Sequence, residues 1–122
     1  MTRKKYTFID LFAGCGGLSE GFLQTGHYEG LAHVEWEMPM INTLRHRLNT
    51  KWKHTPEEAE KRVVCFDVQK TDELIHGNWS DETKALYENK NSRFVVENGL
   101  KGLVENKQVD LIIGGPPCQA YS

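Results

Sequence analysis

The chain has 122 residues and a mass of 14.0 kDa, so it can form at most one domain with a core of moderate size. Its formal net charge of -2 excludes attraction of the whole chain to nucleic acid, so any phosphate contact must come from a local patch. Its three scattered cysteines exclude a disulfide framework, and no apolar run approaches the ~20 residues of a membrane span. We therefore expect a cytoplasmic protein with no membrane segment.

The first part of the chain predicts a strand, a glycine turn and a helix. Residues 6–12 are a short aromatic and β-branched run, which is typical of a strand. Gly14, Gly16 and Gly17 follow this run. Apolar side chains then recur at helical spacing as far as Gly26, which predicts a helix.

Strand and helix patterns then continue to alternate along the chain. Strands are predicted at residues 28–36, 61–68 and 109–113, the last apolar on both faces as in a buried parallel strand. Helices are predicted at residues 38–48, near 81–88 and near 97–105. This order favours an α/β fold with a mostly parallel sheet of about four strands and right-handed crossovers.

Unusual residues follow the carboxyl ends of the predicted strands, where ligands of parallel sheets bind. The glycines follow the first strand, Glu35 and Trp36 end the second, Asp67 ends the third, and Cys118 follows the fourth. A glycine turn lets a ligand approach the backbone, and an acidic residue about twenty positions later suits ribose hydroxyls. The pattern indicates a nucleoside pocket, although the missing third glycine of the dinucleotide fingerprint weakens an NAD interpretation.

Each of these residues also has a plainer interpretation when taken alone. The glycines could form only a tight turn, Glu35 and Asp67 a solvated strand end and a helix cap, and Trp36 part of the core. Cys118 could be a thiolate nucleophile in the ligand crevice or an inert loop cysteine. Cys65, inside an apolar strand, is expected in the core. The joint position at successive strand ends favours a site.

Four segments carry a resemblance to a known family. They are residues 8–18, the pairs Glu35-Trp36 and Asp67-Val68, and residues 114–122, which read Gly-Gly-Pro-Pro-Cys-Gln-Ala-Tyr-Ser. In this order they resemble the first four motifs of the cytosine-C5 DNA methyltransferases. The resemblance implies a Rossmann-like methyltransferase fold with strand order 3-2-1-4, present here in incomplete form. It also implies the family's setting in DNA methylation and restriction-modification.

The resemblance further implies S-adenosylmethionine as the cofactor, no metal, and cytosine in double-stranded DNA as the substrate. Cys118 would be the catalytic nucleophile that adds to C6 of the base. Phe12, Ala13, Gly14, Gly16, Gly17 and Leu18 would hold the methionine end of the cofactor, Glu35 the ribose, Trp36 and Asp67 the adenine, and Val68 and Pro117 would line the pocket.

Later motifs of the family have no counterpart in this sequence. Residues 93–100 look like its glutamate motif, but they precede Cys118 and carry Gly99 where valine is expected, so we interpret Glu97 as an acidic residue near a helix start. We expect residues 1–122 to be the amino-terminal part of the catalytic domain, without the target-recognition domain that would complete the DNA contact. Alone it would keep much of the cofactor pocket but not methylate.

Two alternatives remain open from the sequence. The chain could be the cofactor-binding half of a split or non-catalytic methyltransferase, or it could belong to a relative that methylates cytosine in RNA.

A further expectation concerns assembly. The edge of the fourth strand would lie bare, and exposed apolar edges invite pairing, so we expect self-association.

Overall fold

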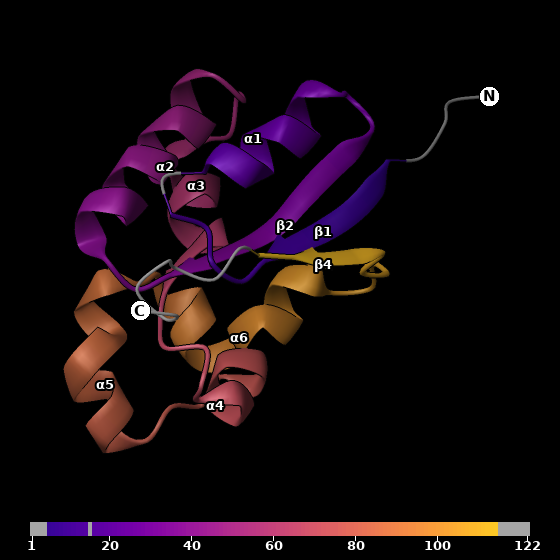
Figure 1. The fold of residues 1–122 in the computed structure, drawn as a ribbon. Helices are drawn as coiled ribbons and strands as arrows, with labels where there is room; N and C mark the ends of the chain where they lie inside the picture. The colour runs from indigo at the N-terminus through magenta and orange to yellow at the C-terminus, as the bar shows by residue number, and fades with distance from the viewer. Residues whose placement is uncertain (1–4, 15, 115–122) are drawn as a thin grey trace, which may run out of the picture.

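The computed structural model describes residues 5–14 and 16–114, which form an α/β domain around a parallel sheet (Figure 1). Within these residues the four strands lie in the order β3-β2-β1-β4, and every neighbouring pair is parallel. The elements follow one another as β1 (Tyr6–Asp10), α1 (Gly17–Gln24), β2 (Tyr28–Glu35), α2 (Met38–Thr50), α3 (Pro56–Arg62), β3 (Val63–Cys65), α4 (Thr71–His76), α5 (Asp81–Tyr87), the 3-10 helix η1 (Glu88–Lys90), α6 (Arg93–Val104) and β4 (Leu111–Ile113).

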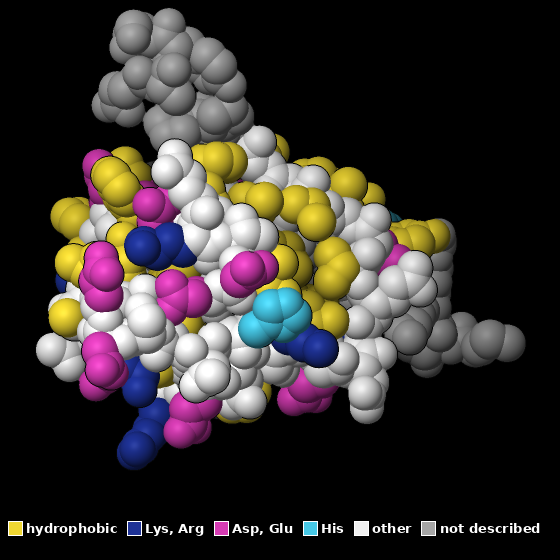
Figure 2. All heavy atoms as spheres, turned by 90° about the horizontal axis from the view of Figure 1, so that it is seen from below, with side chains coloured by type: hydrophobic (Ala, Val, Ile, Leu, Met, Phe, Trp, Pro, Cys, Tyr) yellow, Lys and Arg dark blue, Asp and Glu magenta, His cyan; other side chains and the backbone are white. Residues whose placement is uncertain are grey.

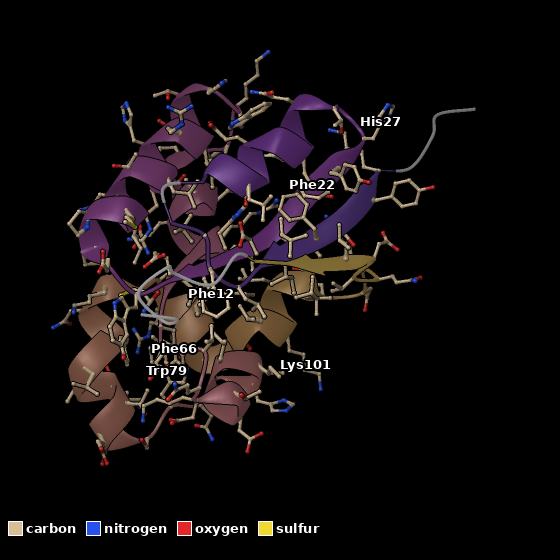
Figure 3. All side chains as sticks on the ribbon, in the orientation of Figure 1. Phe12, Phe22, His27, Phe66, Trp79 and Lys101 are labelled. Carbon is tan, nitrogen blue, oxygen red and sulfur yellow. The ribbon has the colours of Figure 1, made fainter. Side chains whose placement is uncertain are left out.

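Helices cover both faces of the sheet, with α1 and α2 on one side and α4 and α6 on the other (Figure 1). On the first side Ile41, Leu44 and Leu48 of α2 are fully buried against the sheet. On the second side Leu74 of α4 and Val95 of α6 pack on the sheet with Val34 and the aromatic pair Phe66 and Trp79 (Figure 3). None of the helices in the described part of the chain is long and apolar enough to span a membrane. The α/β class and the strand order expected from the sequence are confirmed.

Helix α1 is held at its two ends by different forces. Near its carboxyl end, Phe22 packs on the rings of Phe8 and Tyr28 with centroid separations of 5.7 and 5.0 Å. Near its amino end, Glu20 accepts two hydrogen bonds of 2.7 Å from the Arg47 guanidinium of α2. This bidentate pair, of which Glu20 is largely buried, fixes α1 against α2 and so fixes the glycine turn that precedes α1.

The sequence patterns missed two short helices, α3 and α4. Helix α3 is too polar to show an apolar period, and its signals are local: Thr55 accepts a hydrogen bond from the amide of Glu58, with Pro56 at the first helical position. Because α3 runs to Arg62, the third strand is only three residues long. A helix of six or seven residues is stabilised mainly by packing, which sequence periodicity cannot reveal.

Two further expectations about the strands need correction. Strand β4 is not buried on both faces, because Ile112 is 61% exposed. The fourth strand also begins at Leu111 rather than at residue 109. The start of the strand is held in place by Asp110, whose Oδ2 accepts a 2.9 Å hydrogen bond from the Thr7 amide of β1.

Helices α4 and α6 meet backbone to backbone. A Cβ atom added at Gly99 would lie 2.5 Å from the amide nitrogen of Gly77, and one added at Gly77 would lie 2.6 Å from the amide nitrogen of Gly99. Both glycines have positive φ, and Gly99 interrupts the helical geometry of α6. Gly99 therefore serves helix packing, which accounts for glycine at the place where the family's glutamate motif has valine.

Candidate functional site

The carboxyl ends of the parallel strands bring most of the predicted site residues to one edge of the sheet. Ala13 lies beside the end of β2, because its amide donates a 3.0 Å hydrogen bond to the Val34 carbonyl. Across the sheet, a Cβ added at Gly114 after β4 would lie 3.1 Å from the Phe12 ring. Pro117 and Cys118 lie outside the described residues.

The glycine turn has one position packed closely against the fold, Gly16, and one position with space around it, Gly14. A Cβ added at Gly16 would lie 2.6 Å from Leu44 Cδ1, and Gly16 has φ 101°, so glycine is required there. Gly14 has φ 57°, and a Cβ added there would meet no atom of the described residues within 4 Å. Gly17 then begins α1. The turn thus anchors itself at Gly16 and leaves room for a ligand at Gly14.

Glu35 connects the glycine turn to the end of β2. Its Oε1 accepts a 2.9 Å hydrogen bond from the Gly14 amide, and its Oε2 accepts hydrogen bonds of 2.8 and 2.9 Å from the amides of Trp36 and Glu37. Glu35 is the last residue of β2, and its half-buried carboxylate is held by three backbone amides. The carboxylate is fixed in place before any ligand binds.

Several apolar side chains in and after the glycine turn and after β2 are exposed. Trp36 is 61% exposed, so its alternative interpretation as a core residue is wrong. Phe12 is 37% exposed, and Leu18 and Met40 are also exposed. In Figure 3 Phe12 projects from the end of β1 toward the middle of the molecule. Exposed aromatic rings beside a fixed carboxylate are typical of a surface that binds a flat, polar ligand.

Asp67 and Val68 follow β3 on the far side of Trp36. Asp67 Oδ1 accepts a 2.9 Å hydrogen bond from the Gln69 amide, which closes a turn two residues long. The residue at the cap of the next helix, α4, is Lys70, so the interpretation of Asp67 as a helix cap is wrong. Val68 is half-buried and packs against the core on the α4–α6 side.

A buried polar network beneath the glycine turn was not predicted. Asp10 and His33 are fully buried, and Ser19 lies between them, 2.7 Å from Asp10 Oδ2 and 2.9 Å from His33 Nδ1. Asp10 Oδ1 also accepts a hydrogen bond from the Phe12 amide. The one sequence signal was a carboxylate inside an apolar strand, which must find partners when buried. The network ties β1, β2 and α1 together directly under the site.

The protons of this network follow from burial. Burial lowers the pKa of His33 to about 3, so the ring is neutral. Burial also raises the pKa of Asp10, while the hydrogen bonds from Ser19 and Phe12 oppose that change. When Asp10 is ionised the Ser19 hydroxyl donates to it, so His33 Nδ1–H donates to Ser19. His33 Nε2 then has no partner among the described residues.

Glu97 does not lie with the site residues at the carboxyl edge of the sheet. It is exposed on α6 and pairs with Arg93 at 3.8 Å, with both side chains largely in solvent. Two hollows of about 290 and 470 Å³ lie beside α2–α3 and beside α5–α6, and neither is lined by a predicted site residue. Within the described residues no group of His, Cys, Asp or Glu side chains could hold a metal ion.

The parallel sheet between two helical layers, with a glycine turn, a fixed glutamate and an exposed tryptophan at its carboxyl edge, defines a Rossmann-like α/β domain. Residues 6–122 match the family described as C-5 cytosine-specific DNA methylase, and the chain belongs to this family. The resemblance seen in the sequence is thereby confirmed.

Individual relatives are of several kinds. A putative type II methyltransferase of Methanocaldococcus jannaschii is 31% identical over 132 residues, which cover 94% of this chain and 36% of that protein. A DNA (cytosine-5)-methyltransferase of Paracentrotus lividus is 34% identical, over 97% of this chain and 6% of its own length. A type II methyltransferase of Herpetosiphon aurantiacus is 32% identical, over 93% of this chain and 60% of its own length. The chain thus spans only part of each of these proteins.

Proposed function

We propose that this chain binds S-adenosylmethionine at the carboxyl edge of its sheet, as the cofactor-binding part of a DNA cytosine-C5 methyltransferase. The observation that carries the proposal is the Glu35 carboxylate, which joins the Gly14 amide to the end of β2 beside the exposed Trp36 ring. Membership of the family supports the choice of cofactor.

The methionine end of the cofactor suits the glycine turn, formed by Phe12, Ala13, Gly14, Gly16, Gly17 and Leu18. The space over Gly14 lets a ligand reach the backbone. Helix α1 begins at Gly17, and the amide groups at a helix start favour a carboxylate. Leu18 and Phe12 are exposed on either side of the turn and would shield the ligand from water.

The nucleoside end suits the residues that follow β2 and β3. A carboxylate offers about four acceptor positions, and backbone amides occupy three of those of Glu35, which leaves one on Oε1 for a ribose hydroxyl. Trp36 would stack on the adenine, and Asp67 would accept a hydrogen bond from the adenine amino group. Val68 would line the pocket with Pro117, which lies outside the described residues.

The proposed reaction explains the need for a cysteine. When bound, the cofactor supplies an electrophilic methyl group. The Cys118 thiolate forms an S–C6 bond to cytosine, which moves electron density onto C5 so that C5 can take the methyl group. Transfer of the methyl group would leave S-adenosylhomocysteine as the product. Passage of the C5 proton to a solvent water would then break the S–C6 bond and return the Cys118 thiolate. Because C6 is stacked inside duplex DNA, the base must be rotated out of the helix.

We also propose limits to what this chain does. The named relatives act on DNA or carry type II methyltransferase names, which favours DNA over RNA and a restriction-modification setting in the cytoplasm. The chain spans about a third of the length of the Methanocaldococcus jannaschii relative. We therefore propose that it binds the cofactor alone but does not methylate DNA alone.

The proposal is tested by calorimetric titration of the purified chain with S-adenosylmethionine and with NAD. We expect binding of S-adenosylmethionine only, weakened about tenfold or more by Glu35→Gln, which replaces the charged acceptor of the ribose hydroxyl. Glu37→Gln is the matched control, because its exposed side chain neighbours the site without contacting Gly14. Tighter binding of NAD, or an unchanged affinity in Glu35→Gln, would contradict the proposal.

A second experiment tests whether the chain acts alone. The purified chain is incubated with duplex DNA and cofactor carrying a tritiated methyl group. We expect no label in the DNA. Incorporation of tritium without a second polypeptide would show that this part of the proposal is wrong.

A further inference from the structure

The outer edge of β3 is closed by two side chains instead of by a neighbouring strand. Asn91 Oδ1 accepts a 2.8 Å hydrogen bond from the Cys65 amide, and Asn91 Nδ2 donates a 2.9 Å hydrogen bond to the Cys65 carbonyl. Arg45 Nη2 of α2 donates a 2.7 Å hydrogen bond to the Val63 carbonyl. The primary amide of Asn91 thus offers the donor and acceptor that a peptide group of an adjacent strand would offer.

The segment that carries Asn91 is itself held firmly. Asn91 Nδ2 also donates to the Tyr87 carbonyl at the end of α5, and Arg45 Nη2 also donates to the Lys90 carbonyl. Asn91 is only 9% exposed. The Tyr87 ring lies 5.0 Å from the ring of Phe66, which directly follows Cys65. Asn91 therefore sits in one defined place against β3.

Cys65, whose main chain Asn91 holds, also contacts the candidate site. Its side chain is fully buried, and its thiol donates a 3.5 Å hydrogen bond to the carbonyl of Trp36. Burial raises the pKa of the Cys65 thiol, so the group keeps its proton and remains a donor. The Phe66 amide also donates to the Glu35 carbonyl at 3.0 Å. Asp67 lies two residues after Cys65. The positions of Trp36 and Asp67 therefore both depend on the main chain at Cys65.

We propose that Asn91 is a positioning residue for the adenine end of the cofactor. By fixing the main chain of Cys65, it sets the spacing between the Trp36 ring and the Asp67 carboxylate, between which the adenine is bound. This inference rests on the proposed function. It adds that recognition of the adenine amino group depends on a residue of the α5–α6 connection that touches neither the base nor a residue in contact with it.

The test compares two ligands that differ only at the purine. S-adenosylhomocysteine carries the amino group that Asp67 would accept, and S-inosylhomocysteine carries an oxygen there. We expect the purified chain to prefer the adenosyl compound by about tenfold or more, because a carboxylate loses a donor and meets an oxygen in the inosyl compound. Titration calorimetry at a temperature well below unfolding gives both dissociation constants.

In Asn91→Leu, which keeps the side-chain size and removes both hydrogen bonds to Cys65 and the one to Tyr87, we expect this preference to fall to less than about threefold. Asn89→Leu is the matched control, because Asn89 is exposed on the same segment and should leave the preference unchanged. A role in stability alone would lower the unfolding temperature of Asn91→Leu and leave the preference at its wild-type value, and that result would overturn the inference.

Variants of Cys65 give an independent test if Asn91→Leu fails to fold. We expect Cys65→Ala, which removes the donor to the Trp36 carbonyl, to reduce the preference for the adenosyl compound over the inosyl compound. Cys65→Ser, which restores a donor, should recover that preference. Equal preferences in Cys65→Ala and the wild type would also contradict the inference. A wild-type chain that binds neither compound would refute the proposed function, whereas wild-type discrimination that no variant alters would refute only the role of Asn91.

Discussion

At the scale of single residues, the site is built from groups that are fixed by the backbone before a ligand arrives. Glu35 accepts three amide hydrogen bonds, and Asp10 beneath it accepts one from the Phe12 amide. Groups held in this way need little further ordering when a ligand binds, so more of the contact energy contributes to affinity. Single substitutions in this region should therefore act on both stability and binding.

His33 should make the stability of the chain depend on acid. Its folded-state pKa of about 3 lies below its ordinary value of 6.5, so between these values the unfolded chain binds a proton that the folded chain excludes. The stability contribution of His33 is complete above about pH 6.5 and is lost as the pH falls toward 3. Asp10 acts in the opposite sense, because its raised pKa lets the folded chain bind a proton more readily.

We expect the wild-type chain to lose about 2 kcal/mol of unfolding free energy through His33 between about pH 7.5 and pH 5. His33→Asn, which keeps a donor toward Ser19 but does not titrate, should remove this loss. Urea unfolding at the two pH values measures it. His27→Asn is the control, because His27 is exposed at the turn between α1 and β2 (Figure 3) and should leave the pH dependence unchanged. An equal loss in His33→Asn and the wild type would contradict this account.

Gly16 and Gly21 should respond in opposite directions to the same substitution. Gly16→Ala places a methyl group 2.6 Å from Leu44 Cδ1 at φ 101°, so we expect a loss of about 1–3 kcal/mol of unfolding free energy and weaker cofactor binding. Gly21 lies within α1 with open space around its Cβ position, so Gly21→Ala should add about 0.5–1 kcal/mol. Thermal unfolding separates the two, and a neutral Gly16→Ala would show that the turn is less tightly packed than the distance implies.

At the scale of elements, the two helical layers are held to the sheet in different ways. Helix α1 is anchored to α2 by the Glu20–Arg47 pair, and hydrogen bonding to Arg47 lowers the pKa of Glu20. Helices α4 and α6 rely instead on the close approach of Gly77 and Gly99, strengthened by a 2.9 Å hydrogen bond from the Asn78 amide to the Val96 carbonyl. The close approach of Gly77 to Gly99 leaves no room for a side chain at either position.

Gly99→Val tests the meaning of the segment that looks like the family's glutamate motif. The substitution completes the sequence Glu-Asn-Val, but a Cβ at this position would lie 2.5 Å from the Gly77 amide nitrogen at positive φ. We expect a loss of more than about 3 kcal/mol of unfolding free energy and no gain of methylation. Chemical denaturation and the tritium assay measure the two effects. A stable, active Gly99→Val chain would show that Glu97 belongs to the catalytic apparatus.

At the scale of the whole molecule, the two edge strands of the sheet, β3 and β4, have different surroundings. The outer edge of β3 is closed by Arg45 and Asn91, whereas β4 carries Ile112 exposed to solvent. Figure 2 shows the helical face on the α4–α6 side, where acidic side chains are spread widely and hydrophobic ones lie mainly across the upper half of the view. Among the described residues on that face, the lysine and arginine side chains do not gather into one broad patch.

We propose that the chain self-associates through the outer edge of β4, with which no strand pairs among the described residues, because an unpaired apolar strand offers backbone groups to another strand. Light scattering at rising protein concentration should show dimers or larger species. Ile112→Lys should shift the chain toward the monomer, since a lysine at a strand edge opposes pairing. Leu86→Lys, at an exposed leucine of α5, is the matched control and should not change the association. A monomer at high concentration in the wild type would contradict the proposal.

The sequence by itself determined the order of the long elements and the parallel sheet, because β-branched runs, glycine turns and helical spacing are local signals. The family came from the resemblance of four short motif segments to those of known proteins, and the family match confirmed it. The sequence also singled out Glu35, Trp36 and Asp67, since parallel topology places strand ends on one edge. Assignment of Cys118 likewise rests on sequence, because it lies outside the described residues.

Only the tertiary structure revealed what holds those residues in place. The Asp10–Ser19–His33 network and the contacts of Asn91 with Cys65 join residues 9 to 26 positions apart, and no local pattern records such partnerships. The short helices α3 and α4 were missed for the same reason, since packing rather than periodicity stabilises them. The need for glycine at position 99 likewise became visible only in the fold, where a Cβ at that position would lie 2.5 Å from the Gly77 amide nitrogen. Local sequence signals thus determine where the long helices and strands form. Contacts between residues far apart in the sequence determine how the carboxyl edge of the sheet is arranged.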